Sequence, residues 1–399
     1  MSTNIQKNQI TEGIIWRQLL LFFFPILLGT FFQQLYNTID SVIVGQFVGK
    51  EALAAVGGSS AQIVAFVVGF FTGLSSGASV TIAQFFGAKD SRSANKGLHT
   101  AYAIAAFGGL ILTVSGIILT PFLLEMMNTP ADIVADSAVY LRIYFAGIIF
   151  VLIYNMGSAI LRATGDSKRP LYYLIVCCII NIVLDVLFVI VFHMGVMGVA
   201  VATLIAQAVS AVLVTLKLMR SEGILKLSVK QIRFHGSILK MQLKLGLPTG
   251  FEAILFSITN IAIQSAVNTF GTDTTAAWSA YGKLDAIFWM VSTAFGIAIT
   301  TFVGQNYGAG KMDRVRKSTR VCLLMDFIVS AVLVVFLIAA RFLLFRLFTN
   351  DSHVIEIGCD MLVLITPWYI VYVFIEVIAG ALRGVGNVVV PVVITLLGV

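Results

Sequence analysis

Residues 83–88 read AQFFGA, and 221 residues further along the chain residues 304–309 read GQNYGA. A second pair of stretches keeps the same spacing. LRATG at 161–165 is echoed by LRGVG at 382–386, each with a proline shortly after it. Two separate matches at one shift make coincidence improbable, so the chain is predicted to consist of two repeated halves.

The composition indicates that most of the chain lies in lipid. The 399 residues are 59% hydrophobic and only 11% charged, whereas a soluble domain has roughly 25% charged residues. The mean hydropathy is +0.97. A spanning helix needs about 20 mostly apolar residues, and runs of that length recur throughout the sequence.

Reading the apolar runs between polar breaks predicts ten complete spans and the start of an eleventh. We expect helices, because a membrane barrel would show short alternating segments. The first run is too long for a signal peptide and is interpreted as an uncleaved span. The predicted spans are 15–44, 53–86, 98–119, 134–161, 170–192, 196–218, 241–270, 275–303, 318–340 and 354–382, with a last run from Val388 that is cut off at Val399.

The repeat and the spans together predict an all-α polytopic membrane protein with two six-helix lobes. Six spans is an even number, so both halves enter from the same side and form a parallel repeat about an axis along the membrane normal. The predicted lobes are residues 1–220 and 241–399, joined by a linker at 221–240. A full second copy would continue past Val399, so we expect a chain truncated in span eleven and lacking span twelve.

Basic residues predict the orientation. The connections on one side are basic, and those on the other side hold only Lys50, Arg341 and Arg346. By the positive-inside rule the basic side is cytoplasmic, as is the N-terminus, in a cell (plasma or inner) membrane. The same rule accounts for the net charge of +7, so nucleic acid is not expected as a partner. The basic connections hold Lys89, Arg92 and Lys96; Arg162, Lys168 and Arg169; seven basic residues from Lys217 to Lys244; and Lys311, Arg314, Arg316, Lys317 and Arg320.

Nothing in the sequence predicts an enzyme or a cofactor. There is no phosphate-binding Gly-Lys-Ser/Thr loop, no His-Glu-x-x-His element and no Gly-x-Ser-x-Gly element. The four cysteines, at positions 177, 178, 322 and 359, have no partners at zinc spacing. A disulfide framework or a metal site is therefore not expected, apart from a site for Na⁺.

Polar groups inside the first lobe mark a candidate ion site. An ionisable group at the centre of a span costs about 2.5–3.5 kcal/mol by insertion scales, so such groups usually face a cavity. Helix rise puts Asp185 and Thr203 at a similar depth, with Asn181 one turn from Asp185, and Asp40 lies in the outer part of span one. Two acids with an amide and a hydroxyl suit either a proton site or a Na⁺ site. The alternative is that Asp40 reaches the interface and Asp185 is a packing residue.

A second group of polar residues lies in the other half. Glu252 is in span seven, Glu376 is in span ten, and Tyr372 is one turn from Glu376. They form a candidate cation or substrate site. Pairing of these acids with Lys283 or Arg383 is the structural alternative, and the sequence does not decide between the two.

Small residues pattern the second span of each half. Gly69, Gly73 and Gly77 recur at four-residue spacing, and Ala294 and Ala298 stand at the repeat equivalents of the last two. This spacing lets helices approach closely. A flexible gating helix is the functional alternative.

Three passages resemble the multidrug and toxic compound extrusion (MATE) family, especially its DinF-like bacterial branch. They are QLYNTID at 34–40, GQNYGAG at 304–310 and LRATGD at 161–166. The resemblance implies a twelve-helix fold in two lobes and a monomer that exports cationic or amphipathic compounds in exchange for Na⁺ or H⁺. It also implies that the coupling ion binds Asp40, Asn181, Asp185 and Thr203, and that Glu252 and Glu376 match a second site of NorM-like members. Glu376 departs from the Asp usual there.

The sequence therefore predicts a secondary multidrug exporter embedded in the bilayer, with Asp40 and Asp185 as coupling acids. A lipid-linked oligosaccharide or lipid flippase of the same superfamily is the alternative. A flippase cavity should be broadly basic to hold pyrophosphate, whereas the acids inside these spans predict an acidic one.

Overall fold

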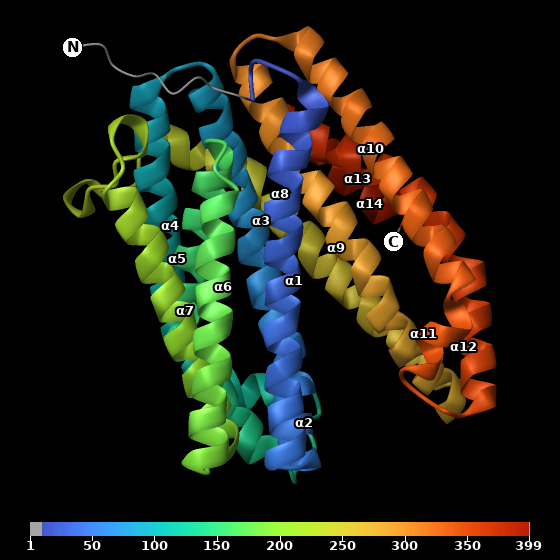
Figure 1. The fold of residues 1–399 in the computed structure, drawn as a ribbon. Coiled ribbons are helices and arrows are strands. Elements are labelled where there is room, and N and C mark those ends of the chain that lie inside the picture. The colour runs from blue at the N-terminus through green and yellow to red at the C-terminus, as the bar shows by residue number, and fades with distance from the viewer. Residues whose placement is uncertain (1–9, 399) are drawn as a thin grey trace. The chain divides into compact units, whose positions relative to one another are not determined.

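A computed structural model describes residues 10–398, and every regular element in that range is helical (Figure 1). Three short stretches wind as 3₁₀ turns, at Gly223–Leu225, Val229–Gln231 and Thr366–Trp368, and one winds as a π-helix, at Val186–Val191. The α-helices are α1 (Ile15–Phe47), α2 (Lys50–Gly57), α3 (Ser59–Gly87), α4 (Ser91–Met126), α5 (Val134–Ala163), α6 (Lys168–Asp185), α7 (Gly195–Met219), α8 (Gly236–Asn268), α9 (Thr272–Gly308), α10 (Met312–Ala339), α11 (Arg341–Arg346), α12 (Ser352–Ile365), α13 (Tyr369–Val385) and α14 (Val389–Gly398).

Ten helical crossings in residues 10–398 are long and apolar enough to span a membrane. Three of them are composite, since α2 and α3 form the crossing 50–87, α6 and the π-helix form the crossing 168–191, and α12 and α13 form the crossing 352–385. Each matches a predicted span to within a few residues, so the all-α polytopic class and the ten spans are confirmed. Helix α14 begins where the eleventh run was predicted.

The chain divides into two compact units whose boundaries fall inside helices α1 and α8. The N-terminal unit is Leu28–Ile254, and the C-terminal unit combines Met1–Leu27 with Leu255–Val399. The first part of α1 thus packs with the C-terminal unit, where Phe23 stacks on Phe295 with ring centroids 4.1 Å apart. The lobes 1–220 and 241–399 remain a prediction from the repeat. The compact units have different boundaries, because residues 15–27 of α1 belong to the C-terminal unit and residues 236–254 of α8 belong to the N-terminal unit.

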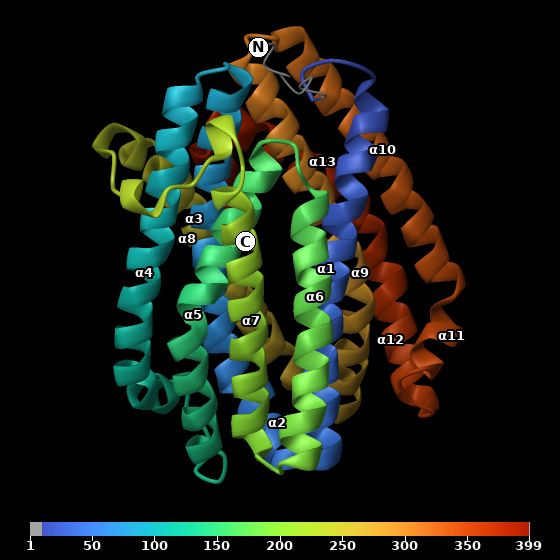
Figure 2. The same ribbon diagram turned by 60° about the vertical axis from the view of Figure 1, so that its left-hand side comes forward.

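Each unit is organised around one central helix. In the N-terminal unit α5 packs against both α4 and α7, and Figure 2 shows the three helices side by side. In the C-terminal unit α9 packs against α10, α12 and α13. The large side chains of α9 fill the centre of that unit, since Phe288, Phe295 and Phe302 are fully buried.

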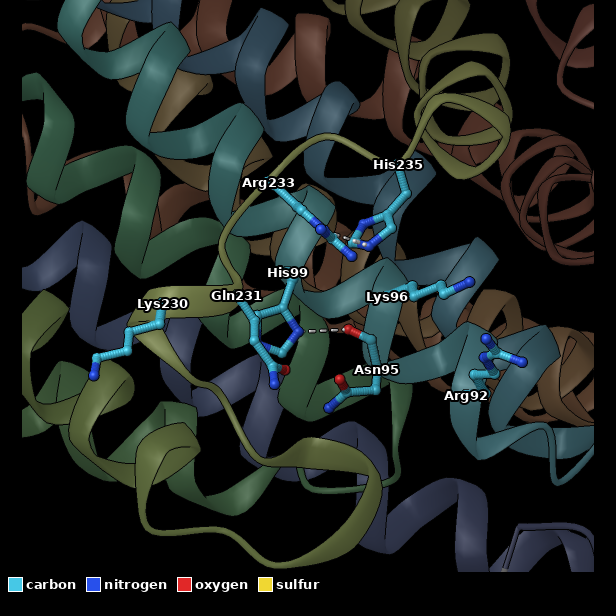
Figure 3. A pocket seen from close by; sticks show the side chains of 8 residues that line it. All are labelled: Arg92, Asn95, Lys96, His99, Lys230, Gln231, Arg233 and His235. Atoms are coloured by element: carbon cyan, nitrogen blue, oxygen red, sulfur yellow. Dashed lines mark hydrogen bonds between the residues drawn. The ribbon is translucent and has the colours of Figure 1, made fainter.

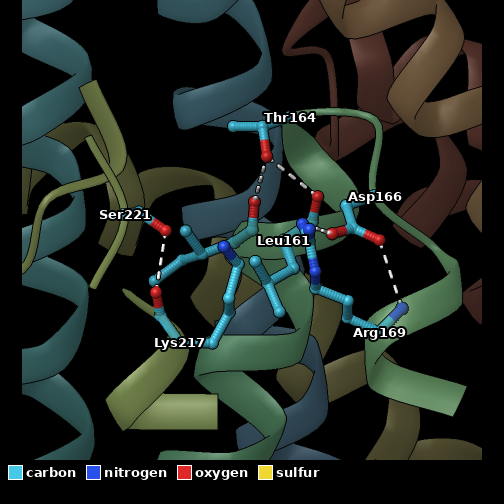
Figure 4. A network of polar contacts seen from close by, with 7 residues as sticks. Leu161, Thr164, Asp166, Arg169, Lys217 and Ser221 are labelled. Atoms are coloured by element: carbon cyan, nitrogen blue, oxygen red, sulfur yellow. Dashed lines mark hydrogen bonds and ion pairs between the residues drawn. The ribbon is translucent and has the colours of Figure 1, made fainter. Parts of the chain in front are cut away.

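The two repeated sequence motifs are helix endings, and their backbone hydrogen bonds repeat as well. After α5, the Asp166 amide donates to the Leu161 carbonyl at 2.9 Å, and after α13 the Asn387 amide donates to the Leu382 carbonyl at 2.9 Å. The preceding Gly165 and Gly386 both adopt positive φ, which lets the chain turn back on the helix end. Figure 4 shows this turn in the N-terminal unit, where Asp166 also pairs with Arg169 at the start of α6.

The AQFFGA and GQNYGA motifs close α3 and α9 in the same way. The Gln84 carbonyl accepts from the Ala88 amide at 2.9 Å, and the Gln305 carbonyl accepts from the Ala309 amide at 3.0 Å. Gln84 and Gln305 therefore occupy equivalent positions at the ends of equivalent helices. This confirms the predicted repeat.

The repeat also preserves one contact between helices. The Ser79 hydroxyl on α3 donates to the Ala159 carbonyl on α5 at 3.2 Å. At the positions 221 residues later, the Thr300 hydroxyl on α9 donates to the Gly380 carbonyl on α13 at 3.0 Å. Both units therefore pack their second and fourth spans in the same register.

The glycines of α3 allow backbone contact with α8. A Cβ added to Gly73 would lie 2.4 Å from the Gly250 nitrogen, and one added to Gly77 would lie 2.4 Å from the Gly246 nitrogen. No side chain fits at such distances, so the two helices touch through their main chains. The structure thus supports the packing interpretation of the glycine spacing over the gating one.

We predict that Gly73→Ala destabilises the protein, because its methyl group would push two backbones apart. Overpacking of this kind costs about 1–3 kcal/mol. Gly282→Ala is the matched control, since a Cβ there meets nothing within 4 Å and alanine favours a helix by about 1 kcal/mol over glycine. Thermal unfolding of the purified variants in detergent tests this. Equal unfolding temperatures for Gly73→Ala and wild type would contradict the backbone contact.

Candidate functional site

Three helices of the N-terminal unit bring together the four polar residues predicted from the first half. Asp40 comes from α1, Asn181 and Asp185 come from α6, and Thr203 comes from α7. Asn181 and Asp185 are fully buried, and Asp40 and Thr203 are 8% and 7% exposed. The burial contradicts the alternative that Asp40 simply reaches the interface.

The side chains of this group interact with one another. Asp40 lies within hydrogen-bonding reach of Asp185, Thr203 and Asn181, and the Asn181 amide donates to the Thr203 hydroxyl at 3.5 Å. Within the described residues, both Asp185 oxygens, Asp40 Oδ1 and Asn181 Oδ1 accept no conventional hydrogen bond. Asn181 and Thr203 can therefore donate to Asp40, whereas both oxygens of Asp185 face it without a donor among the described residues.

Two ionised carboxylates within hydrogen-bonding reach of each other repel, and burial strengthens that repulsion. The pair is compatible with two occupants. A proton shared by Asp40 and Asp185 supplies the missing donor, and a small cation would bind their oxygens together with those of Asn181 and Thr203. Both occupants bring one positive charge, which is what an exchange site for H⁺ or Na⁺ requires.

A local irregularity of α6 coincides with this pair. Asp185 is the last α-helical residue, and the next turn, Val186–Val191, is π-helical. π-turns are rare and frequently occur at functional sites, because they rotate the following residues relative to the α-helical register. The apolar stretch VLFVIV gives no sign of the turn, so the sequence does not predict it.

The structure adds neighbours that the sequence analysis did not assign to the site. Gln207 on α7 donates its amide to the Tyr36 hydroxyl on α1 at 3.3 Å, and both side chains are at least nine-tenths buried. Tyr140 on α5 lies close enough to Asp40 and Asp185 to interact with their charges. Tyr36 and Gln207 stand one helical turn from Asp40 and Thr203, so a search along the same helix faces would have found them.

Glu376 in the C-terminal unit is already paired. Its Oε1 lies 3.6 Å from Arg383 Nη1, and its Oε2 accepts from the Tyr372 hydroxyl at 3.2 Å. The carboxylate is pressed against α9, where only glycine fits at position 296, since a Cβ there would lie 2.1 Å from Glu376 Oε1. The arrangement matches the structural alternative of an ion pair with Arg383.

Glu252, the other acid of that candidate site, is 4% exposed and belongs to the N-terminal compact unit. Tyr372 and Glu376 belong to the C-terminal unit. A joint site of Glu252 with Glu376 therefore stays a prediction.

Two acids of the C-terminal unit that the sequence analysis did not assign accept hydrogen bonds from side chains within the spans. Asp285 on α9 accepts from the Tyr369 hydroxyl and from Trp289 Nε1, the latter at 2.8 Å. Asp326 on α10 is fully buried and accepts from the Ser330 hydroxyl at 3.1 Å. The carboxylate of Asp285 is thus stabilised by two neutral hydrogen-bond donors. Asp326 lies within electrostatic range of Glu376.

The fold and its buried acids define a multi-pass membrane protein of the transporter type. The family model described as MatE matches residues 25–187 and 248–399. Because this match covers more than half of the chain, the protein belongs to the MatE family. The membership confirms the resemblance seen in the sequence and the expectation of a membrane transporter rather than an enzyme.

Curated relatives of the chain are named as drug-resistance proteins. It is 30% identical over 393 residues to the probable multidrug resistance protein YoeA of Bacillus subtilis, covering 96% of this chain and 84% of that protein. It is 27% identical to the probable multidrug resistance protein NorM of Thermotoga maritima, covering 99% of this chain and 85% of that protein.

Solved structures share the fold at lower identity. One is the outward-facing conformation of a multidrug resistance MATE family transporter of the MOP superfamily, with a TM-score of 0.92 at 22% identity over 99% of this chain and 88% of that chain. Another is a MOP superfamily transporter from Pyrococcus furiosus, with a TM-score of 0.91 at 22% identity and the same coverage of both chains. These likenesses confirm the MATE fold.

We predict that Na⁺ or mild acid raises the unfolding temperature of the wild-type protein and that Asp185→Asn abolishes this rise. A ligand at a hundred times its dissociation constant stabilises by about 2.7 kcal/mol, and the variant lacks one of the two carboxylates that hold it. Expression and membrane insertion should be intact, since the substitution removes a costly buried charge. Asp132→Asn, at an exposed loop position, is the control. A variant that responds to ions as the wild type does would contradict the site.

Proposed function

We propose that the protein is a secondary multidrug exporter that couples the entry of Na⁺ or H⁺ to the export of cationic or amphipathic small molecules. The observation that carries this proposal is the buried pair of Asp40 and Asp185, with its neutral partners Asn181 and Thr203. The names of the curated relatives support the drug-export part.

The chemistry of the pair suits ion exchange. Buried acids that lack donors have a strong preference for being occupied, either by a proton or by a cation. A cationic compound that binds near them loses part of its favourable interaction when the ion arrives. By reciprocal linkage the ion then favours release of the compound, and the compound favours release of the ion.

The coupling acids are assigned to the N-terminal unit because the charges of the two units differ. Asp40 and Asp185 have no basic partner among the interactions of the described residues, whereas Glu376 is paired with Arg383. A cation would have to displace a guanidinium to bind Glu376. Glu252, Tyr372 and Glu376 are therefore the secondary candidate for cation or substrate binding.

The orientation follows from the charge distribution. We assign the N-terminus and the basic connections to the cytoplasmic side of a cell membrane, in accordance with the positive-inside rule. The working form is assigned as a monomer of two lobes, residues 1–220 and 241–399, that alternate access. No cofactor is needed, because the ion gradient drives transport.

A flippase for lipid-linked oligosaccharides is the competing function, and the fold alone does not exclude it. In the Pyrococcus furiosus transporter, reverse polarity of the binding pocket suggests a different function, so pocket polarity is the property to compare. Among the described residues, the buried side chains that carry a charge within the spans are the acids Asp40, Asp185, Glu252 and Asp326, which disfavours a pyrophosphate-bearing substrate.

We predict that Asp40→Asn reduces gradient-driven drug efflux far more than Glu376→Gln does. Loss of a coupling free energy of 1–3 kcal/mol corresponds to about a 5- to 150-fold loss, whereas Glu376→Gln removes a charge that is compensated internally. The measurement is efflux of a fluorescent cation from proteoliposomes at matched protein content, under imposed Na⁺ and pH gradients. The assignment is wrong if Glu376→Gln stops transport while Asp40→Asn transports normally.

We further predict that Asn181→Ala distinguishes the two coupling ions. A proton needs only the two carboxylates, whereas Na⁺ also needs neutral oxygen ligands such as the amide oxygen of Asn181. If Na⁺ is the coupling ion, the variant loses Na⁺-driven efflux. Retained pH-driven efflux in the same variant would identify H⁺, and loss of both activities with Thr203→Ser unaffected would show that Asn181 acts in another way.

A further inference from the structure

A cavity of about 330 Å³ lies at the beginning of α4, where the linker between α7 and α8 folds over it (Figure 3). It is separate from the acid pair described above and belongs entirely to the N-terminal unit. Its volume is at the lower end of the range of ligand pockets, which is about 300–1,000 Å³. The lining residues are Arg92, Asn95, Lys96, His99, Lys230, Gln231, Arg233 and His235.

The lining is strongly basic. Arg92, Lys96, Lys230 and Arg233 each carry a positive charge, and no Asp or Glu within residues 10–398 lines the cavity. The nearest acid in sequence is Asp90, which caps α4 by accepting from the Ser93 amide at 3.0 Å. This hydrogen bond lowers the pKa of Asp90 and engages its carboxylate with the helix end. The cavity therefore has four cationic side chains and no internal counterion.

The walls of the cavity are held in place by hydrogen bonds. The Asn95 side-chain amide donates to the carbonyls of Ile224 and Lys226, both at 3.1 Å. His99, which is 1% exposed, accepts the Ser228 amide at 3.0 Å through Nε2 and contacts the Asn95 carbonyl at 2.8 Å through Nδ1. A loop that only carried orientation charges would not need this framework, whereas a binding site does.

His235 adds a titratable group to the same cavity. Its Nε2 accepts from Arg233 Nε at 3.3 Å (Figure 3). Its Nδ1 lies 3.1 Å from the Thr100 hydroxyl. Burial lowers the pKa of His235, as do the charges of Arg233 and Lys96 and the nearby His99. A bound anion would offset these charges, so that protonation of His235 and binding of the anion favour each other.

We propose that this cavity is a binding site for a phosphate group, carried either by the headgroup of an acidic phospholipid or by a soluble phosphate compound. Arg233 and Lys96 both lie close enough to His235 to act on its charge, and Arg and Lys are the side chains that bind phosphate oxygens in proteins. Basic pockets beside spanning helices are suited to acidic headgroups. The bound phosphate would join the start of α4 to the linker that leads into α8.

Binding to the full-length protein in detergent tests the proposal, with two probes that separate the sources. One probe is inorganic phosphate, compared with chloride at matched ionic strength. The other is dioleoyl phosphatidylglycerol added to the micelles, compared with dioleoyl phosphatidylcholine and counted by native mass spectrometry. We expect one saturable site for at least one probe, and the probe that binds identifies the source.

The variants separate a built site from general surface charge. The double variant Lys96→Ala/Arg233→Ala should weaken binding at least about tenfold, which corresponds to 1.4 kcal/mol. The control Arg220→Ala/Lys168→Ala removes the same charge at exposed positions outside the cavity and should bind as the wild type does. If the first variant does not fold, Lys230→Ala, at an exposed position, serves instead. Equal weakening by cavity and control variants would overturn the proposal, as would no binding of either probe.

The dependence on pH provides a second readout. Phosphatidylglycerol is suited to it, because its diester does not titrate near neutral pH. Binding should tighten as pH falls through the range in which His235 takes up a proton, and His235→Gln should remove that change. If binding of phosphatidylglycerol is found and tightens equally in His235→Gln, His235 does not belong to the site and the proposal is wrong in this part.

Discussion

A hydrocarbon environment offers the polypeptide backbone no hydrogen-bonding partner, so each amide and carbonyl must find one within the protein. The helical crossings satisfy this requirement along their lengths, and the difficulty is concentrated at their ends. The two repeated motifs lie at such ends. At Gly165 and Gly386 the chain turns back and supplies donors to the last carbonyls of the helix. The sequence motifs that reveal the duplication are thus the residues that form the same hydrogen-bonded turn at the C-terminal ends of equivalent helices.

The same lack of hydrogen-bonding partners in lipid means that the role of a buried acid depends on the groups that surround it. An acid in a span can be stabilised by a base, by neutral donors or by a transient ligand. Arg383 balances Glu376, and Tyr369 and Trp289 donate to Asp285. Among the described residues the pair of Asp40 and Asp185 has no base, and both oxygens of Asp185 lack a donor, although Asn181 and Thr203 reach Asp40. Which donors surround an acid, more than where the acid lies in its span, therefore distinguishes a candidate exchange site from a structural acid.

The fold could be predicted from the sequence because hydropathy and a 221-residue shift are properties of the chain alone. The first candidate site could be predicted for a similar reason, since helix rise alone puts Asn181, Asp185 and Thr203 at one depth. Contacts that depend on helix rotation could not be predicted. The sequence left open whether Glu376 meets Arg383, and it did not assign Asp326 a role. The π-helical turn after α6 and the boundaries of the compact units inside α1 and α8 also depend on tertiary packing.

The contact between α3 and α8 has a consequence for leakage. Where Gly73 faces Gly250 and Gly77 faces Gly246, backbone meets backbone and no room for a water molecule remains between the two helices at these points. A continuous chain of water molecules between the helices of a membrane protein would let protons cross the bilayer and dissipate the proton gradient, because protons hop along connected water. The small residues at this crossing therefore help to exclude water, and with it proton leakage, as well as allowing the two helices to pack closely.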